Sequence, residues 1–184
     1  MNNFFSPLKE SKAFNEASTH LKGGKKIYIN NVTDSQKIHL THALGESFDV
    51  RLIVTYDDIH ASQILEECTT YNKNCVYFKG KDVCFFRADI CGNQIAMERL
   101  KTFRALRESE NLTVVTTIDA LMTHVISLDV LNDNIMTLKV HSVCETEALS
   151  IKLTNMGYER VDIVDAPGQY AVRGGIVDIF DLTM

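Results

Sequence analysis

Strand-like and helix-like segments alternate between residues 25 and 120, and this alternation restricts the possible folds more than any other feature of the chain. The strand-like segments are rich in apolar and β-branched residues, and the helix-like segments carry apolar residues at helical spacing. Parallel strands need a long crossover connection, so a strand–helix–strand order favours a parallel sheet covered by helices. The expected strands cover residues 25–32, 50–56, 75–86 (one or two short strands) and 112–117, and the expected helices cover 35–44, 59–71, 93–109 and 118–125.

A different pattern follows from about residue 127. Residues 127–140 alternate as a strand would, and a helix over 145–156 is predicted from a possible capping box formed by Ser142 and Glu145. Gly157 is placed to end that helix. The remaining residues are strand material interrupted by a turn, in which Pro167 followed by Gly168 suits a type II turn. These last expected strands cover 158–165, 169–174 and 175–180.

The chain is therefore predicted to have two domains. Residues 1–126 form an α/β domain with a parallel sheet, and residues 127–184 form a smaller α+β domain. The second domain would be marginally stable alone, because so short a chain buries little apolar surface. The printed sequence stops just after a strand, so we expect this domain to be truncated at its C-terminal end.

Composition limits the classes of function. The formal net charge of −5 gives no general attraction to nucleic acid or to an anionic membrane. No apolar stretch is long enough to span a bilayer. The five cysteines are scattered without a C-x-x-C pair, which predicts reduced thiols in a cytoplasmic protein. The six histidines show no metal-site spacing, so no metal and no cofactor are expected.

The segment after the first expected strand, NVTDSQKI, lies where a phosphate-binding loop would lie. Such a loop reads G-x-x-x-x-G-K-[ST], because bare backbone wraps the anion and a hydroxyl holds Mg²⁺. Lys37 is present, but Asn31, Asp34 and Gln36 stand where glycine is expected, and Ile38 replaces the hydroxyl residue. The residues favour an ordinary strand–turn–helix over a working nucleotide site. A nucleotide-binding domain stays as an alternative function.

Basic residues give a second alternative, a DNA-binding helix at 93–109. Residues at positions i, i+3 and i+6 share a helix face, and such a row can follow a phosphate backbone. Acidic neighbours and the acidic composition favour a solvated surface instead. The basic residues are Arg99, Lys101, Arg104 and Arg107, with Arg87 before the helix, and the acidic ones are Glu98, Glu108 and Glu110.

The stretch QYAVRGGIVDIF, residues 169–180, offers a candidate binding residue. Strand alternation places Arg173 on the face opposite Tyr170 and Val172. Gly174 and Gly175 then permit a bulge or a close approach of a partner's backbone. An arginine there suits paired hydrogen bonds with a carboxylate, although an ordinary surface arginine is the simpler interpretation.

Catalytic residues are not expected. The acidic pairs Asp57–Asp58 and Asp162/Asp165 have no base or nucleophile that their spacing associates with them. The serines and histidines lie outside any nucleophile motif of the G-x-S-x-G kind.

Three stretches together resemble the N-terminal region of the bacterial transcription-repair coupling factor family (Mfd). They are GYERVDIVDAPGQYAVRGGIVDIF, ADICGNQIAMERLKTFRAL and LTVVTTIDALM, and the first is similar almost position by position. That region is related to the damage-recognition protein UvrB, whose loop reads GVTGSGKT. Compared with that loop, residues 31–38 keep the Val-Thr, Ser and Lys but have lost each glycine and the final threonine.

The resemblance implies a degenerate RecA/P-loop-like first domain with a decayed ATP site. It further implies a non-catalytic fragment that recruits UvrA in transcription-coupled nucleotide excision repair. RNA polymerase and DNA would be bound through other domains of a longer protein, which also hold its ATP-dependent motor, and no membrane is involved. The UvrA-contacting arginine of the family falls on Arg173, beside Gly174 and Gly175.

Overall fold

The computed structural model describes residues 3–80 and 88–183. The chain divides into two compact units, Met1–Met122 and Thr123–Met184. Unit 1 contains η1 (Asn3–Phe5), α1 (Ser6–Lys9), α2 (Lys12–Lys22), α3 (Asp34–Leu44), β1 (Val50–Thr55), α4 (Asp58–Tyr71), β2 (Cys75–Phe78), α5 (Ala88–Glu108), β3 (Leu112–Thr117) and α6 (Ile118–Leu121). Unit 2 contains α7 (Leu128–Asp133), α8 (Thr146–Asn155), β4 (Glu159–Arg160), β5 (Gln169–Arg173) and β6 (Ile176–Ile179).

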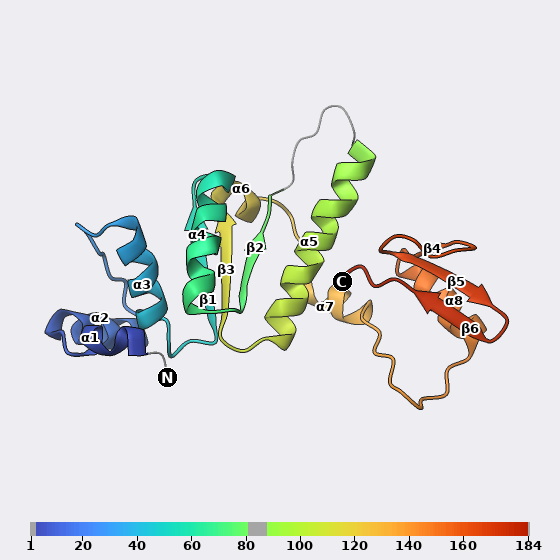
Figure 1. Cartoon of the computed structure of the whole chain (residues 1–184), viewed down its shortest axis with the longest axis horizontal. Coiled ribbons are helices and arrows are strands. Elements are labelled where there is room, and N and C mark those ends of the chain that lie inside the picture. Colours follow the sequence, from blue (N-terminus) through green and yellow to red (C-terminus); the bar gives the residue numbers. More distant parts are fainter. Residues whose placement is uncertain (1–2, 81–87, 184) are drawn as a thin grey trace. The chain divides into compact units, whose positions relative to one another are not determined.

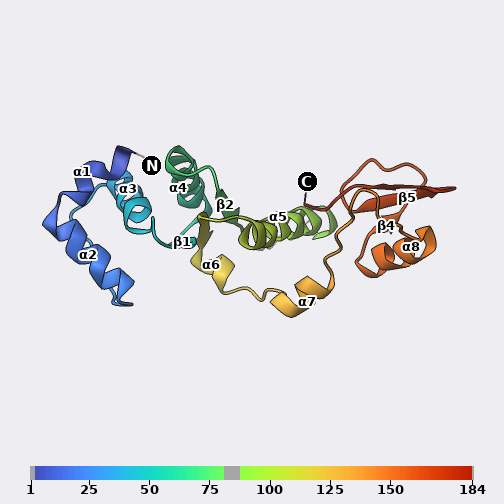
Figure 2. The same ribbon diagram turned by 90° about the horizontal axis from the view of Figure 1, so that it is seen from below.

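Unit 1 is built on a parallel sheet with the strand order β1-β3-β2. All six residues of β3 are buried, as its continuous apolar and β-branched sequence predicts. In Figures 1 and 2, β2 lies between α4 and α5. Val115 packs in the cluster under α4, and Val114 packs with Phe103 of α5 on the other face. The predicted α/β fold with a parallel sheet is confirmed.

The α5 face of the sheet is open at β1. Leu52 is the register partner of Val114 and therefore shares its face, yet Leu52 is 55% exposed. Val50 and Val54, two residues to either side, are also exposed. The strand expected at 50–56 forms as β1, but one of its faces is exposed, because α5 covers β2 and β3 and not β1.

Unit 2 packs α8 on a small mixed sheet with the order β4-β5-β6 (Figure 1). Leu149 and Leu153 of α8 meet Tyr170, Val172 and neighbouring apolar side chains of the sheet. Two glycines set the local backbone. Gly157 ends α8 with φ 88°, and the amide of Tyr158 returns to the Leu153 carbonyl at 3.0 Å. Gly168 has φ 84°, as the predicted type II turn requires at its third position.

Some predicted elements are wrong. Residues 25–32 form no strand in the described structure: Tyr28 is 87% exposed and no described strand pairs with the segment. Strand propensity alone does not hold an unpaired segment extended. Residues 127–140 are not a strand either. Ser127 accepts a hydrogen bond from the Val130 amide at 3.3 Å and starts α7 instead.

Capping and strand length also differ from expectation. Thr33 is the N-cap of α3, and Gln36 completes its capping box. The expected box at Ser142 is absent, since its hydroxyl donates to the Lys139 carbonyl. Of the strand expected at 158–165 only β4 forms, and the second half of the 75–86 run lies largely outside the described residues.

Candidate functional site

The segment that resembles a phosphate loop leads into α3. Asn31 keeps a positive φ of 58°, a conformation that glycine adopts most easily and asparagine tolerates. The Lys37 ammonium pairs with Asp34 at 2.7 Å, and this hydrogen bond lowers the pKa of the Asp34 carboxyl. Ile38 is 5% exposed and packs with Ala61 in the core under α4. The lysine is thus partnered by a carboxylate, and the side chain at 38 faces inward.

A hollow between α3 and α4 lies beside this segment. Its polar lining includes Lys37 and His60 but also three carboxylates, Asp34, Glu66 and Glu67. Carboxylates repel the phosphates of a nucleotide. The hollow is therefore a poor place for the triphosphate that a working loop would hold.

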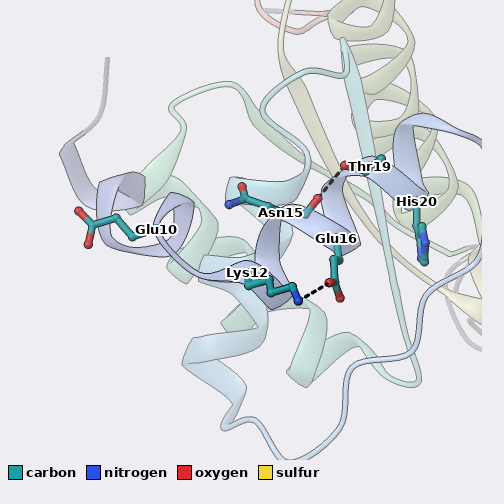
Figure 3. Close-up of a pocket in the computed structure, with 6 residues that line it drawn as sticks. All are labelled: Glu10, Lys12, Asn15, Glu16, Thr19 and His20. Carbon is teal, nitrogen blue, oxygen red and sulfur yellow. Dashed lines mark hydrogen bonds and ion pairs between the residues drawn. The ribbon is translucent and has the colours of Figure 1, made fainter.

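A second hollow runs along α2 (Figure 3). Lys12 pairs with Glu16 at 3.9 Å, and the Thr19 hydroxyl donates to the Asn15 carbonyl at 2.8 Å. Both interactions lie within one helix, and the Lys12 side chain is 92% exposed. Exposed ion pairs of this kind contribute little energy. The figure shows side chains along the helix surface and gives no reason to place a ligand there.

The basic row on α5 is smaller than the sequence suggested. Lys101, Arg104 and Arg107 are exposed, and Arg104 Nε lies 3.0 Å from a carboxylate oxygen of Glu108. Arg99 is buried instead: its guanidinium carbon lies 4.6 Å from the centre of the Phe78 ring, and Nε donates to the Lys79 carbonyl at 2.9 Å. Burial lowers the pKa of Arg99. Arg87 lies outside the described residues.

Arg173 ends β5 at a two-residue hairpin turn. Its register partner on β6 is Ile176, and Gly174 between them has φ 61°. A positive φ at the first turn residue belongs to the tight turns that join antiparallel strands, so the glycine pair forms a hairpin turn rather than a bulge. The side chain of Arg173 is 65% exposed and forms an ion pair with Asp178.

Asp178 is the residue that the sequence interpretation missed. It lies opposite Ala171 in the register, so it shares the face of Arg173. Strand alternation on both sides of a two-residue turn would have predicted this diagonal pair. One face of the β5–β6 hairpin carries Arg173, Asp178 and the exposed Ile176. This face points away from α8, because Tyr170 and Val172 on the other face pack against that helix. We call these three side chains the hairpin face.

Neither a metal site nor a membrane-spanning helix occurs among the described residues. No group of three or more His, Cys, Asp or Glu side chains there is placed to hold a metal ion. In the same residues no helix is both long and apolar enough to cross a membrane.

Comparison with known proteins supports the resemblance. Residues 136–184 match the UvrB interaction domain. The chain is 25% identical to the transcription-repair-coupling factor of Bacillus subtilis over 100% of its own length and 16% of the relative. It is 29% identical to that of Staphylococcus epidermidis over 95% of the chain and 15% of the relative. A Staphylococcus aureus coupling factor is 33% identical over 48% of the chain and 8% of the relative. The resemblance is therefore confirmed, and the chain spans about one sixth of the curated relatives that it matches.

Proposed function

We propose, from the premise that the chain is a relative of the transcription-repair-coupling factors, that unit 2 is a docking module for UvrA. The match to the UvrB interaction domain covers residues 136–184, which lie within unit 2. UvrA is the partner that the family resemblance implies. We propose that the chain shares the role of the named relatives in transcription-coupled repair, and that recruitment of UvrA is its part in that role.

The exposed Arg173 is the observation that carries the proposal. Its guanidinium stands beside a glycine turn, where a methyl group added at Gly174 or Gly175 would meet no atom within 4 Å. A partner can therefore approach the backbone closely at this end of the hairpin. Asp178 holds the guanidinium on the hairpin face in the free chain. A carboxylate of UvrA could share or replace that pair through the planar fork of the arginine.

A catalytic role receives no support from unit 1. The Lys37–Asp34 ion pair, the inward Ile38 and the carboxylates of the neighbouring hollow all disfavour nucleotide binding. The DNA-binding alternative rests on three exposed basic side chains of α5, one of which is paired with Glu108. We therefore propose that this chain binds and does not catalyse, and that no cofactor is needed.

Other activities belong to the longer proteins that the chain resembles. The chain covers 15–16% of the first two relatives, so their motor, and contacts with RNA polymerase and DNA, stay proposals for a longer protein. A cytoplasmic location is likewise a proposal, supported by the cysteines of the sequence, which are scattered without a C-x-x-C pair.

UvrA affinity measured by calorimetry tests the docking proposal. Arg173→Ala should weaken binding by ~2–5 kcal/mol if the guanidinium makes a desolvated, charge-assisted contact. Arg173→Lys should restore only part of the loss, because an ammonium lacks the planar fork. Gly175→Ala should weaken binding without changing the free energy of unfolding, since the added methyl meets only the partner.

Arg160→Ala is the matched control. Arg160 is an exposed arginine of the same unit, and its register with Tyr170 places it on the opposite face of the sheet. Its removal should leave UvrA affinity unchanged. Equal UvrA affinity of the wild type and the Arg173→Ala variant, with both chains folded, would show that Arg173 lies outside the interface.

A further inference from the structure

A polar row crosses the core of unit 1 on the face covered by α3 and α4. Arg51 of β1 and Cys75 of β2 are both register partners of Thr113, which lies between them on β3. Thr113 is fully buried, and Arg51 is 7% exposed. Two further side chains lie over this row, His42 from α3 and Cys68 from α4, and both are buried. Five polar or thiol side chains thus meet inside the core of unit 1.

Arg51 brings a buried positive charge to this row. Its Nε donates to the Thr113 hydroxyl at 3.0 Å, and Nη1 donates to the Gly45 carbonyl at 3.0 Å. Nη2 donates to the Asn111 carbonyl at 3.1 Å. Within the described part of the chain no carboxylate pairs with Arg51. A buried cation bonded only to neutral groups favours a negative charge nearby.

Cys68 and Cys75 form the second part of the cluster. Cys68 lies in the last turn of α4 and has 0% exposure, whereas Cys75 opens β2 and is half-buried. The two side chains pack in one cluster under α4, and each thiol shifts the pKa of the other. In its neutral form Cys75 donates its S–H to the Asn72 carbonyl, with sulfur and oxygen 2.9 Å apart. Cys75 is therefore the more accessible residue of the pair.

His42 is arranged to take a proton from Cys75. The Ile38 carbonyl lies 3.0 Å from Nδ1 and can only accept, so the neutral imidazole carries its hydrogen on Nδ1. Nε2 is then the accepting nitrogen. It lies 3.4 Å from the hydroxyl of Thr113, the register neighbour of Cys75, and His42 lowers the pKa of the Cys75 thiol. The Arg51 bond to Thr113 uses a lone pair of that hydroxyl and leaves its hydrogen available for a thiolate.

These contacts rank the acidity of the two thiols. The hydrogen bond from Cys68 lowers the pKa of Cys75, whereas burial raises this pKa. His42 and Thr113 lower the pKa of Cys75 further. The same thiol–thiol bond raises the pKa of Cys68, and burial raises it too. Cys75 is thus the thiol that ionises, and Cys68 stays protonated beside it. The thiolate is the reactive form of cysteine toward oxidants.

We propose that Cys75 and Cys68 are a peroxide-sensitive thiol pair, in which Cys75 is oxidised first and Cys68 then closes a disulfide. The Cys75 sulfur attacks one oxygen of hydrogen peroxide, the O–O bond breaks, and the departing hydroxide takes the proton held on His42. Cys75 is then a sulfenic acid. The Cys68 sulfur attacks it, the S–O bond breaks, and the hydroxide leaves as water with the Cys68 proton. Two thiols and one peroxide give one disulfide and two waters.

The sequence supplies a direct assay. Lys73 lies between the two cysteines, so trypsin separates Cys68 in peptide 52–73 from Cys75 in peptide 74–79. After treatment of the folded chain with equimolar hydrogen peroxide, mass spectrometry without reductant should show these two peptides joined. In Cys68→Ala, dimedone should label the Cys75 sulfenic acid instead, because the resolving sulfur is gone. Cys75→Ser should abolish both products.

Cys144 is the internal control. It is exposed in unit 2, and its sulfur lies 3.9 Å from the Glu145 carbonyl. In the wild type, peroxide should consume the free thiol of Cys75 at least ~10-fold faster than that of Cys144, since thiolate character governs oxidation. Equal rates at Cys75 and Cys144 would overturn the proposal. So would a peroxide-treated wild type in which Cys68 and Cys75 stay reduced, or one in which Cys75 joins a different cysteine.

Discussion

The side chain of Arg51 occupies the space that a Cβ atom of residue 45 would need: a Cβ added to Gly45 would lie 2.3 Å from Arg51 Cδ. Arg51 Nη1 also donates to the Gly45 carbonyl at 3.0 Å. The glycine is therefore needed for its size, because its φ of −82° suits any residue.

The first prediction concerns that contact. Gly45→Ala should destabilise unit 1 by ~1–3 kcal/mol, because the methyl meets both Arg51 and the Thr41 carbonyl, the latter at 2.8 Å. Gly23→Ala is the matched control, with the same φ and no contact nearer than 3.5 Å, and should change the free energy of unfolding by less than ~0.5 kcal/mol. Urea unfolding measures both. Equal stabilities of the two variants would show that Arg51 can leave this position at no cost.

The second prediction concerns Lys37. Its ammonium is exposed and, among the described residues, pairs with Asp34 alone, so Lys37→Ala should change the free energy of unfolding by less than ~0.5 kcal/mol. ATP with Mg²⁺ should give no binding heat in calorimetry. A low-micromolar Kd that Lys37→Ala removes would restore the nucleotide alternative.

The third prediction separates backbone strain from crowding in unit 2. Gly168 and Gly157 both have a positive φ, 84° and 88°, but only at Gly168 would a Cβ meet a neighbour, Leu182 Cδ2 at 2.8 Å. Each change to alanine should cost ~1–3 kcal/mol for the left-handed backbone. The Gly168→Ala variant should lose somewhat more of the free energy of unfolding than the Gly157→Ala variant, as measured by thermal or urea unfolding. A neutral Gly157→Ala would contradict the strain that we assign to both.

The fourth prediction concerns the Tyr170 hydroxyl. It lies 2.9 Å from the Ser150 hydroxyl and 2.8 Å from the Thr154 hydroxyl, on a side chain that is 1% exposed. Tyr170→Phe should therefore lower the stability of unit 2 by ~1–1.5 kcal/mol. Tyr28→Phe removes a hydroxyl from a residue 87% exposed and should be neutral. Unfolding followed by circular dichroism compares the two, and matching values would argue against a role for the hydroxyl network.

The fifth prediction is a pH profile. The hydrogen bond from Cys68, aided by His42 and Thr113, lowers the pKa of Cys75 from 9.0 to about 5 against the effect of burial. A lowered pKa means that the folded chain holds the thiolate between these two values, where the unfolded chain holds the thiol. Alkylation of Cys75 by iodoacetamide should be near its plateau at neutral pH and fall as the pH drops toward 5. In urea the midpoint should move up to the ordinary thiol value. If the pH midpoint of Cys75 alkylation were the same in the folded chain and in urea, the surrounding side chains would not lower the pKa of Cys75.

Sequence patterns predicted the parts of the fold that depend on continuous or periodic apolar content. β3 is an unbroken run of apolar and β-branched residues, and it is the buried centre of its sheet. The glycines at 157 and 168 were assigned correctly because each conformation has a local cause. The segment at 25–32 has strand propensity as well, but a strand also needs a neighbour, and propensity contains no information about pairing.

Sequence periodicity could not predict the polar side chains in the core of unit 1. Arg51 occupies the second position of an apolar run, and pattern rules place such an arginine at the surface. Its burial depends on acceptors at Gly45, Asn111 and Thr113, of which the last two lie 60 and 62 residues along the chain from Arg51. Arg99 is a similar case, since the Phe78 ring that covers it lies on another element. The ion pair of Arg173 with Asp178, by contrast, follows from a two-residue turn and could have been predicted.

The position of β3 has a consequence for synthesis of the chain. β1 and β2 both pair with β3, and β3 is the last of the three to leave the ribosome. The stretch from Phe78 to Thr117 takes roughly 2–8 s to make at ~5–20 residues per second. During that time the two earlier strands expose apolar side chains and unpaired backbone edges. Nascent chains halted in this interval are the ones that should depend most on a holding chaperone.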